Sequence, residues 1–397
     1  MAEDKIKTLL SKGVEEVIKR DSLEKKLRAG KKLRIKYGAD PSAPDLHLGH
    51  SVCLWKLKEF QDLGHQVIFI IGDFTGLIGD PSGRDKTRPA LSKEEIEKNA
   101  KTYFEQAGKI LDIKKIEIKK NSQWFSKMDL ADFLKLAGQF TLARIIERDD
   151  FSQRLKKGID IGFHETIYPL LQAYDSIMVK ADVEVGGRDQ KFNLLAGREL
   201  QKKMGQPEQD LMLFPLLVGA DGKKKMSKSL GNYIGLTESA NEQYGKIMSI
   251  SDDLIFHYFE LCARLSQEEI KEIKKETDSG RLNPRDAKAR LAREIVSLYH
   301  GKTAAEKAEK EFIQVFREKK KPTQMPVQKI KAGKWNVLDL LFKLKLAPSK
   351  SEAKRLIEQG GVKIDGRVVK DWKVEIQIKD GLVAQVGKRK FVRLKRS

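Results

Sequence analysis

The feature that most constrains the fold is an apolar run, a stiff loop and a helix-like run that follow one another near the N-terminus. Leu33, Ile35 and Tyr37 alternate like strand residues, and the helix-like run extends from 52 to 63. Two prolines stiffen the loop between them, because each fixes φ and removes a backbone donor. Strand-like and helix-like runs continue to alternate further along, so we expect an α/β fold around a parallel sheet.

Two histidines, His47 and His50, lie three residues apart where this helix begins. A helix places such residues on one face, and its N-terminus presents unpaired N–H groups with a partial positive charge. Gly49 lets a bulky ligand approach the backbone closely. The stretch therefore predicts a site for nucleotide phosphates. Such a pair is also common by chance, whereas a metal site is disfavoured, because no glutamate follows the first histidine.

A second candidate phosphate-binding segment is the lysine loop, residues 221–232. It contains Lys225, Ser227 and Lys228, and glycines bracket the lysine–serine stretch, so we expect a mobile loop. Lysine ammonium groups suit a compact, moving phosphate charge. Taken alone, the segment could equally be a solvated basic loop.

Further polar residues follow strands or share a helix face. The apolar strand at 66–71 ends in a glycine-rich loop with Asp80, which is typical of a ligand-facing loop. Tyr168, Gln172 and Asp175 fall at i, i+4 and i+7, on one face of a helix. They form either a ladder of donors and acceptors for a small polar ligand or the solvated stripe of an amphipathic helix. The proline after Tyr168 places that residue just outside the regular helix.

Two other segments carry expectations. A strand at 181–185 ends in two glycines, which permit a ribose or phosphate to approach, and Asp189 behind them could bind hydroxyl groups. The region 124–165 is mainly helical and holds more apolar residues than one small layer needs. These residues could form either a dimer contact or part of the core. These residues are Phe133, Leu134, Leu136, Phe140, Leu142, Ile145 and Ile146.

The charge balance points to a polyanionic partner. The 397 residues carry a formal net charge of +21, and residues 335–397 hold sixteen Lys and Arg against seven Asp and Glu. Nucleic acid or an anionic membrane would match this excess. No run approaches the ~20 apolar residues of a transmembrane helix, and the N-terminus lacks a signal-peptide core. The two cysteines, Cys53 and Cys262, indicate a reducing cytoplasm without a disulfide framework.

The stretch from Ala347 to Gly366 resembles the S4 RNA-binding domain. Lys350, Lys354 and Arg355 share one face of its predicted helix, which stops at two glycines before a strand. This face is expected to contact an RNA backbone, and a solvated basic helix is the alternative.

The histidine stretch and the lysine loop together resemble the paired signatures of the class I aminoacyl-tRNA synthetases. The stretch from Tyr168 to Asp175, followed by Gly186-Gly187-Arg188-Asp189-Gln190, is similar to the bacterial tyrosyl-tRNA synthetases, and the resemblance covers essentially the whole chain. It implies a Rossmann-like parallel-sheet catalytic domain over 1–236, a helical domain over 237–318, a linker over 319–334 and a small α+β S4 RNA-binding domain over 335–397.

The resemblance also implies which residues meet each substrate. Asp175 would accept the phenolic hydroxyl of tyrosine. The tyrosine-binding set is Gly38, Asp80, Tyr168, Gln172, Asp175 and Gln190. The ATP-binding set is Asp40, His47, Gly49, His50, Gly187, Asp189, Lys225 and Lys228. The catalytic set is His47, His50, Lys225, Ser227 and Lys228.

The implied reaction joins tyrosine to tRNA(Tyr) in two steps. The tyrosine carboxylate attacks the α-phosphorus of ATP, and the terminal ribose of the tRNA then takes the tyrosyl group from the adenylate. Because no covalent protein intermediate is needed, positioning and electrostatics dominate. Mg²⁺ would accompany ATP, no protein-bound structural metal is expected, and a cytoplasmic homodimer is implied.

Two residues depart from the family pattern, and three other protein classes are open. Lys36 stands where better-studied members carry a tyrosine that contacts the phenol, and Glu184 stands where others carry a glutamine. A tryptophanyl-type synthetase shares the fold but would lack the S4 domain. A nucleotidylyltransferase would explain the histidines but needs an added RNA-binding tail. A non-catalytic RNA-binding protein would have no use for the lysine loop.

Overall fold

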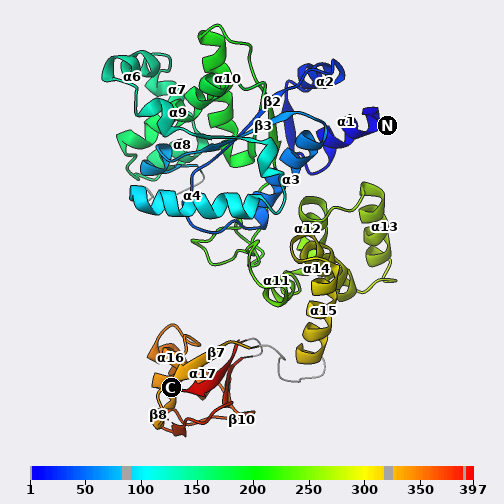
Figure 1. Ribbon diagram of the computed structural model, residues 1–397, viewed down its shortest axis with the longest axis vertical. Helices are drawn as coiled ribbons and strands as arrows, with labels where there is room; N and C mark the ends of the chain where they lie inside the picture. The colour runs from blue at the N-terminus through cyan, green and yellow to red at the C-terminus, as the bar shows by residue number, and fades with distance from the viewer. Residues whose placement is uncertain (1, 83–90, 317–324, 388–389) are drawn as a thin grey trace. The chain divides into compact units, whose positions relative to one another are not determined.

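The computed structural model describes residues 2–82, 91–316, 325–387 and 390–397 (Figure 1). The chain divides into two compact units, Met1–Ala305 and Glu306–Ser397. Among the described helices, none combines the length and the apolar character that a membrane crossing requires.

A six-stranded sheet forms the centre of the first unit. Its order is β1-β6-β5-β2-β3-β4, and every pair is parallel except β1 with β6. The expected parallel α/β sheet is therefore confirmed, with one antiparallel edge strand added. The strands are β1 (Glu16–Ile18), β2 (Arg34–Ala39), β3 (Gln66–Ile71), β4 (Glu117–Lys120), β5 (Val183–Gly187) and β6 (Asp210–Phe214).

The strand order changes direction between β2 and β5. The chain builds outward from β2 through β3 to β4 and then returns to the other side of β2 with β5 and β6. In open α/β sheets a ligand-binding crevice forms at the carboxyl ends of the strands beside such a switch. Strands β3 and β6 are buried almost throughout, as expected of central strands covered on both faces.

Helices surround this sheet and continue into a helical region beyond β6 (Figure 1). Those before β6 are α1 (Ala2–Ser11), α2 (Arg20–Arg28), α3 (Leu48–Asp62), α4 (Lys93–Ala107), α5 (Ser122–Phe125), α6 (Leu130–Ala137), α7 (Leu142–Ile146), α8 (Asp149–Lys156), α9 (Phe163–Val179) and α10 (Lys191–Lys203). Those after it are α11 (Ala240–Ile247), α12 (Ile255–Cys262), α13 (Gln267–Asp278), α14 (Pro284–His300) and α15 (Lys302–Phe316).

Local sequence signals explain where several helices begin. Ser92 accepts a hydrogen bond from the N–H of Glu95, whose carboxylate accepts one from the N–H of Ser92, so the two residues cap α4 reciprocally. Asn283 caps α14, and Pro284 occupies its first turn, where a missing N–H costs nothing.

Helix α9 contradicts one expectation, because Tyr168 lies inside it and not before it. The helix runs without interruption from Phe163 to Val179 and includes both Tyr168 and Pro169. Both side chains are buried. The packing of these two side chains in the interior therefore outweighs the preference for extended backbone that a residue before proline normally has.

The apolar residues of the region 124–165 divide between core and surface. Leu136 and Ile145 are buried in clusters that include residues of α9. Leu134 and Leu142, by contrast, are 61% and 59% exposed. We call the exposed members, together with their neighbours, the apolar surface: Leu130, Leu134, Leu142, Leu155 and Phe163.

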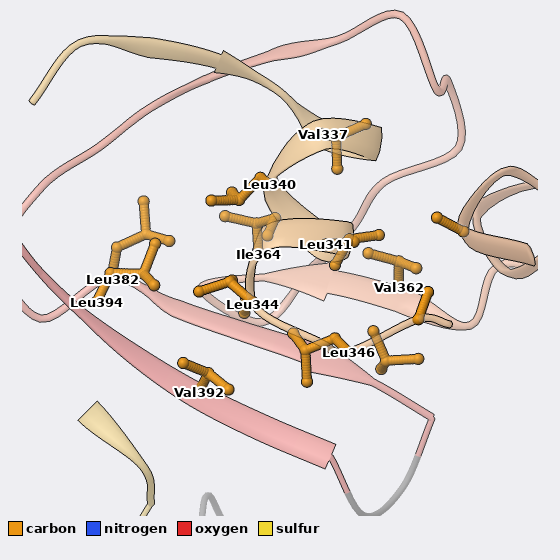
Figure 2. Close-up of a cluster of buried hydrophobic side chains, with 14 of the residues drawn as sticks. Val337, Leu340, Leu341, Leu344, Leu346, Val362, Ile364, Leu382, Val392 and Leu394 are labelled. Carbon is orange, nitrogen blue, oxygen red and sulfur yellow. The ribbon is translucent and has the colours of Figure 1, made fainter. Parts of the chain in front are cut away.

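The second unit contains a five-stranded sheet of order β10-β9-β12-β13-β7 and a separate pair, β11 with β8. Side chains of α16, α17 and the strands form its core, which Figure 2 shows. Its elements are β7 (Val327–Ile330), β8 (Lys334–Asn336), α16 (Val337–Lys343), α17 (Lys350–Glu358), β9 (Val362–Ile364), β10 (Arg367–Val368), β11 (Glu375–Gln377), β12 (Val383–Val386) and β13 (Lys390–Arg396).

Strand β7 lies within residues 319–334, the expected linker. It pairs in parallel with β13, with Val327 opposite Arg393. The small sheet therefore begins earlier than the boundary at 335, because main-chain pairing recruits a segment without a strand-like pattern. Residues 319–324 of the expected linker lie outside the described residues.

Candidate active site

One pocket gathers residues from the carboxyl ends of β2, β5 and β6, the start of α3, helix α9 and the lysine loop. Every residue that the sequence assigned to tyrosine, ATP or catalysis lines it. These are Gly38, Asp40, His47, Gly49, His50, Asp80, Tyr168, Gln172, Asp175, Gly187, Asp189, Gln190, Lys225, Ser227 and Lys228. The residues lie at the crevice that the strand order predicts.

His47 and His50 cap helix α3. Nδ1 of His47 accepts a hydrogen bond of 3.1 Å from the N–H of Gly49, and Nδ1 of His50 accepts one of 3.2 Å from the N–H of His47. A ring nitrogen that accepts carries no proton, so the proton of each neutral imidazole is on Nε2. The expected unpaired N–H groups are thus partly satisfied by the histidines themselves, and each ring retains one Nε2–H donor.

Burial keeps both imidazoles neutral. It lowers the pKa of His50 to about 3, with the nearby Lys228 ammonium acting in the same direction. Burial, the adjacent His50 ring and Lys228 also lower the pKa of His47 far below its ordinary value. At neutral pH the two rings are therefore donors without charge.

Gly49 lines the pocket and also has a role in the helix cap. A Cβ at this position would lie 3.0 Å from both Nδ1 and Cε1 of His47. Such a contact is tighter than ordinary van der Waals packing, so a side chain would push on the imidazole that caps the helix. The glycine makes room for the cap.

The segment directly after the lysine loop meets the histidine stretch through the backbone. The N–H of Leu48 donates to the carbonyl of Ile234 at 2.9 Å, and His47 pairs with Gly235 as an isolated bridge. Asn232 anchors the loop, because its side chain accepts from the N–H of Ser227 and donates to Asp221. The two signature segments therefore lie side by side in one pocket.

The two loop lysines occupy different surroundings. Nζ of Lys225 lies 2.9 Å from Oδ2 of Asp189, and these side chains are 34% and 21% exposed. Nζ of Lys228 lies 6.0 Å from the ring centroid of Tyr103 and close enough to both histidines to lower their pKa values. Positive charge thus stands beside neutral imidazole donors.

A buried carboxylate, Asp175, lies on α9 in the same pocket. Oδ1 accepts from Nε1 of Trp124 at 2.9 Å, and Oδ2 accepts from Nδ2 of Asn121 at 3.4 Å. Burial raises the pKa of Asp175 to about 7, against the opposing effects of Lys36 and of these two hydrogen bonds. A buried carboxylate with lone pairs to spare is an acceptor suited to a hydroxyl group.

A second set of carboxylates, Asp40 and Asp80, lies elsewhere in the pocket. Asp40 accepts from Oη of Tyr168 at 2.9 Å and from Oγ1 of Thr75 at 2.7 Å, and Asp80 accepts from Nε2 of Gln190 at 2.7 Å. Burial and the neighbouring Asp40 raise the pKa of Tyr168, so its hydroxyl stays protonated. Paired carboxylates and hydroxyl groups of this kind can hold an ammonium group.

Sequence reasoning missed the residues that connect these carboxylates. Nδ2 of Asn121 donates to Oγ1 of Thr75 at 3.0 Å and also reaches Asp175, so Thr75 and Asn121 link Asp40 to Asp175. Asn121 follows β4 directly, and a polar residue at a strand's carboxyl end was the available signal. Trp124 carried no such signal.

Three predicted RNA-binding residues lie in the second unit on α17. The side chains of Lys350, Lys354 and Arg355 are 61%, 46% and 57% exposed, and each has an acidic neighbour within 4 Å. Exposed pairs of this kind contribute only about 0–1 kcal/mol, so a phosphate could displace them. Among the described residues, no group of three His, Cys, Asp or Glu side chains could hold a metal ion.

Comparisons with known proteins agree with this arrangement. Residues 28–317 match the family described as "tRNA synthetases class I (W and Y)", and residues 337–381 match the S4 domain. Tyrosine–tRNA ligase of Moorella thermoacetica is 52% identical over 390 residues, which cover 97% of this chain and 94% of that protein. Tyrosine–tRNA ligase of Thermotoga maritima is 50% identical over 392 residues, which cover 99% and 97%.

Solved structures are similar as well. The structure of tyrosyl-tRNA synthetase complexed with L-tyrosine from Archaeoglobus fulgidus has a TM-score of 0.64 and 25% identity, covering 78% of this chain and 100% of that chain. A truncated mitochondrial tyrosyl-tRNA synthetase from Aspergillus nidulans has a TM-score of 0.66 and 25% identity, covering 79% and 94%.

Proposed function

The chain belongs to the tyrosine–tRNA ligases within the class I tRNA synthetases, and we propose from this premise which residues carry out each part of the reaction. The enzyme uses ATP to activate tyrosine and joins the tyrosyl group to tRNA. The tryptophanyl alternative is not favoured, because the curated relatives that match the chain over nearly its full length at about 50% identity are tyrosine enzymes.

His47 and His50 serve as fixed, neutral hydrogen-bond donors to the phosphates of ATP. Their Nδ1 atoms are occupied in the helix cap, which leaves Nε2–H as the donor of each ring. Because the cap fixes both rings, they need no reorganisation when charge develops on the phosphoryl group.

Lys225 and Lys228 supply the positive charge that the imidazoles lack. As pyrophosphate leaves, two ammonium groups on the loop stabilise its growing negative charge, and Ser227 lies between them. Mg²⁺ that arrives with ATP would add charge at the same phosphates. Asp189, which pairs with Lys225, is placed to bind the ribose hydroxyls once that lysine turns to the phosphates.

Tyrosine binds across the other end of the pocket. Its ammonium group is held by Asp80, Tyr168 and Gln172, and its phenolic hydroxyl donates to Asp175. The observation that carries this assignment is the burial of Asp175, which is 4% exposed and already supported by Trp124 and Asn121. A ligand without the hydroxyl would leave this carboxylate buried without its partner, which costs about 1–3 kcal/mol or more.

The direct test is amino-acid-dependent exchange of pyrophosphate into ATP, run with tyrosine, tryptophan and phenylalanine. We expect exchange with tyrosine alone. Exchange with tryptophan at a comparable kcat/KM would overturn the assignment of Asp175, because an indole has no hydroxyl in the position of the phenol.

Two assemblies are part of the same proposal. Lys350, Lys354 and Arg355 of the S4 domain contact the tRNA backbone, where counterion release makes such binding sensitive to salt. The apolar surface on α6 to α9 forms a homodimer contact, since five large, exposed apolar side chains fall within four successive helices. The two cysteines are free and buried, which fits the cytoplasmic location that we propose.

A further inference from the structure

Lys36 and Glu184 have no role in the reaction described above. They form an ion pair behind the tyrosine end of the pocket. They lie opposite each other in the parallel pairing of β2 with β5. Nζ of Lys36 is 2.9 Å from Oε1 of Glu184, and the two side chains are 0% and 1% exposed. Glu184 also lines the pocket, whereas Lys36 lies behind it.

The hydrogen bonds of this pair are complete. Lys36 Nζ donates to the carbonyl of Gln172 at 2.9 Å and to Oγ of Ser176 at 2.7 Å, so all three ammonium protons have acceptors. Glu184 accepts from Ser176, Gln172 and Gln209. A buried ion pair usually stabilises a fold no more than an apolar pair of similar volume. Stability alone therefore gives no reason for these two charges.

Glu184 determines how the amide of Gln172 is oriented. Nε2 of Gln172 donates to Oε1 of Glu184 at 3.3 Å. A carboxylate can only accept, so Gln172 must turn its NH₂ group towards Glu184 and keep its carbonyl oxygen for another partner. A substrate ammonium group has donors only, and that carbonyl oxygen is the atom it requires.

Lys36 acts on Asp175, which follows Gln172 by three residues on α9. The charged and titratable groups near Asp175 are Lys36 from β2, Glu184 from β5 and Tyr168 from α9, with Asp40 and Asp80 acting on Tyr168. Burial raises the pKa of Asp175, Lys36 lowers it, and Glu184 raises it to a smaller degree. The geometry agrees, because Nζ of Lys36 donates to Gln172 and Ser176, which lie on either side of Asp175 along α9, so Lys36 is the cation next to this carboxylate.

We propose that the Lys36–Glu184 ion pair is a positioning and specificity-determining element of the tyrosine pocket. Glu184 fixes Gln172 with its oxygen available for the substrate ammonium group, and Lys36 keeps Asp175 a charged acceptor for the phenol. This inference rests on the proposed roles of Gln172 and Asp175.

The test is the pH dependence of kcat/KM for tyrosine in pyrophosphate exchange, which reports groups of the free enzyme. An acid limb arises where Asp175 gains its proton, so a higher pKa moves the limb to higher pH. Lys36→Met should move the limb up by roughly 1 pH unit or more, and Glu184→Gln should move it down. A purely structural pair would not give shifts of opposite sign. Both variants should raise KM for tyrosine more than they lower kcat at alkaline pH.

The double variant Lys36→Met/Glu184→Gln guards against misfolding, because it removes both charges of the pair and leaves neither of them buried without its partner. It should melt near the wild-type temperature and still move the limb upward, since the effect of Lys36 on Asp175 exceeds that of Glu184. The matched control is Arg154→Met/Glu165→Gln, which removes another pair with both side chains 2% exposed, also involving α9 but outside the pocket lining. That control should leave the limb in place.

Two results would overturn the inference: an unmoved limb in all three Lys36 and Glu184 variants, or shifts of the same sign in both single variants. Failure of the proposed function would look different. In that case the wild-type enzyme itself would show no limb that Asp175→Asn removes, or would not prefer tyrosine.

Discussion

Replacing Asp175 by asparagine should abolish a loss of stability that the wild type undergoes as the pH rises. The carboxyl group is 4% exposed, and burial raises its pKa from 3.8 to about 7. The folded state therefore binds a proton that the unfolded state has already released, so wild-type stability falls as pH rises between these two values. At about 1.4 kcal/mol per pKa unit the full effect is about 4 kcal/mol, of which the interval from pH 5 to pH 8 contains about 2–3 kcal/mol.

Calorimetric melting of both proteins at pH 5 and pH 8 measures this effect. Asparagine has no charge to bury, so the other groups cancel in the difference between the two proteins. The variant's melting temperature relative to the wild type should be higher at pH 8 than at pH 5 by roughly 5 °C. If the melting temperatures of the two proteins differed by the same amount at both pH values, Asp175 would not titrate in this interval. The reasoning from burial would then be refuted.

The same substitution should reduce the preference for tyrosine over phenylalanine. Nδ2 of Asn121 already points at Asp175, and its own oxygen accepts from the N–H of Phe74, so the amide cannot turn. The NH₂ group of an asparagine at 175 would therefore oppose the NH₂ group of Asn121. The phenol would also lose its charged acceptor. Loss of a hydrogen bond to a charged group costs about 1.5–3 kcal/mol, or roughly 10–100-fold in the ratio of kcat/KM values. An unchanged ratio would remove Asp175 from the recognition of the hydroxyl.

Other substitutions test the remaining parts of the site. Lys228→Met should lower kcat for pyrophosphate exchange by about 100-fold while the Kd for tyrosine measured by equilibrium dialysis stays the same; an equal loss of both would contradict the assignment. His50→Ala should weaken the cap of α3 by about 1 kcal/mol in thermal unfolding and also reduce exchange, because it removes both an acceptor for the backbone and a donor to the phosphates. Removal of residues 325–397, which include β7, should spare exchange but abolish tRNA charging, and intact charging would refute the RNA role of the S4 domain. Leu134→Asp should convert a dimer into monomers in analytical ultracentrifugation, and an unchanged mass would place the dimer contact elsewhere.

The sequence predicted the sheet from local apolar patterns, and the resemblance to the synthetases supplied the set of pocket residues. Apolar runs define β3 and β6, and the two signature segments carry their residues at fixed spacing. The network behind the pocket was not predictable in the same way. Lys36 and Glu184 are 148 positions apart, and only the parallel register of β2 with β5 makes them neighbours. No periodicity in either segment reveals that register.

The histidines show a second limit of sequence reasoning. A helix N-terminus has unpaired N–H groups in general, and that rule predicted free backbone donors for phosphate. In this chain the imidazoles of His47 and His50 accept hydrogen bonds from two of those N–H groups. The donor available to a phosphate is then Nε2–H of each ring. Residue identity and spacing were the same in both interpretations, so only the orientation of the rings distinguishes them.

The two ends of the pocket place their charges in opposite ways. At the phosphate end, Lys225 is partly exposed, its pair with Asp189 is weak in water, and it can change partners at small cost. At the tyrosine end, Lys36, Glu184 and Asp175 are buried and hydrogen-bonded, so these side chains keep their positions while substrate enters and leaves. The negative charge on pyrophosphate grows only as it departs, so cations that can move suit it. The phenolic hydroxyl of tyrosine is present throughout the reaction, so a rigid acceptor suits it. Substitutions at the first end should therefore change kcat, and those at the second should change substrate preference and stability together.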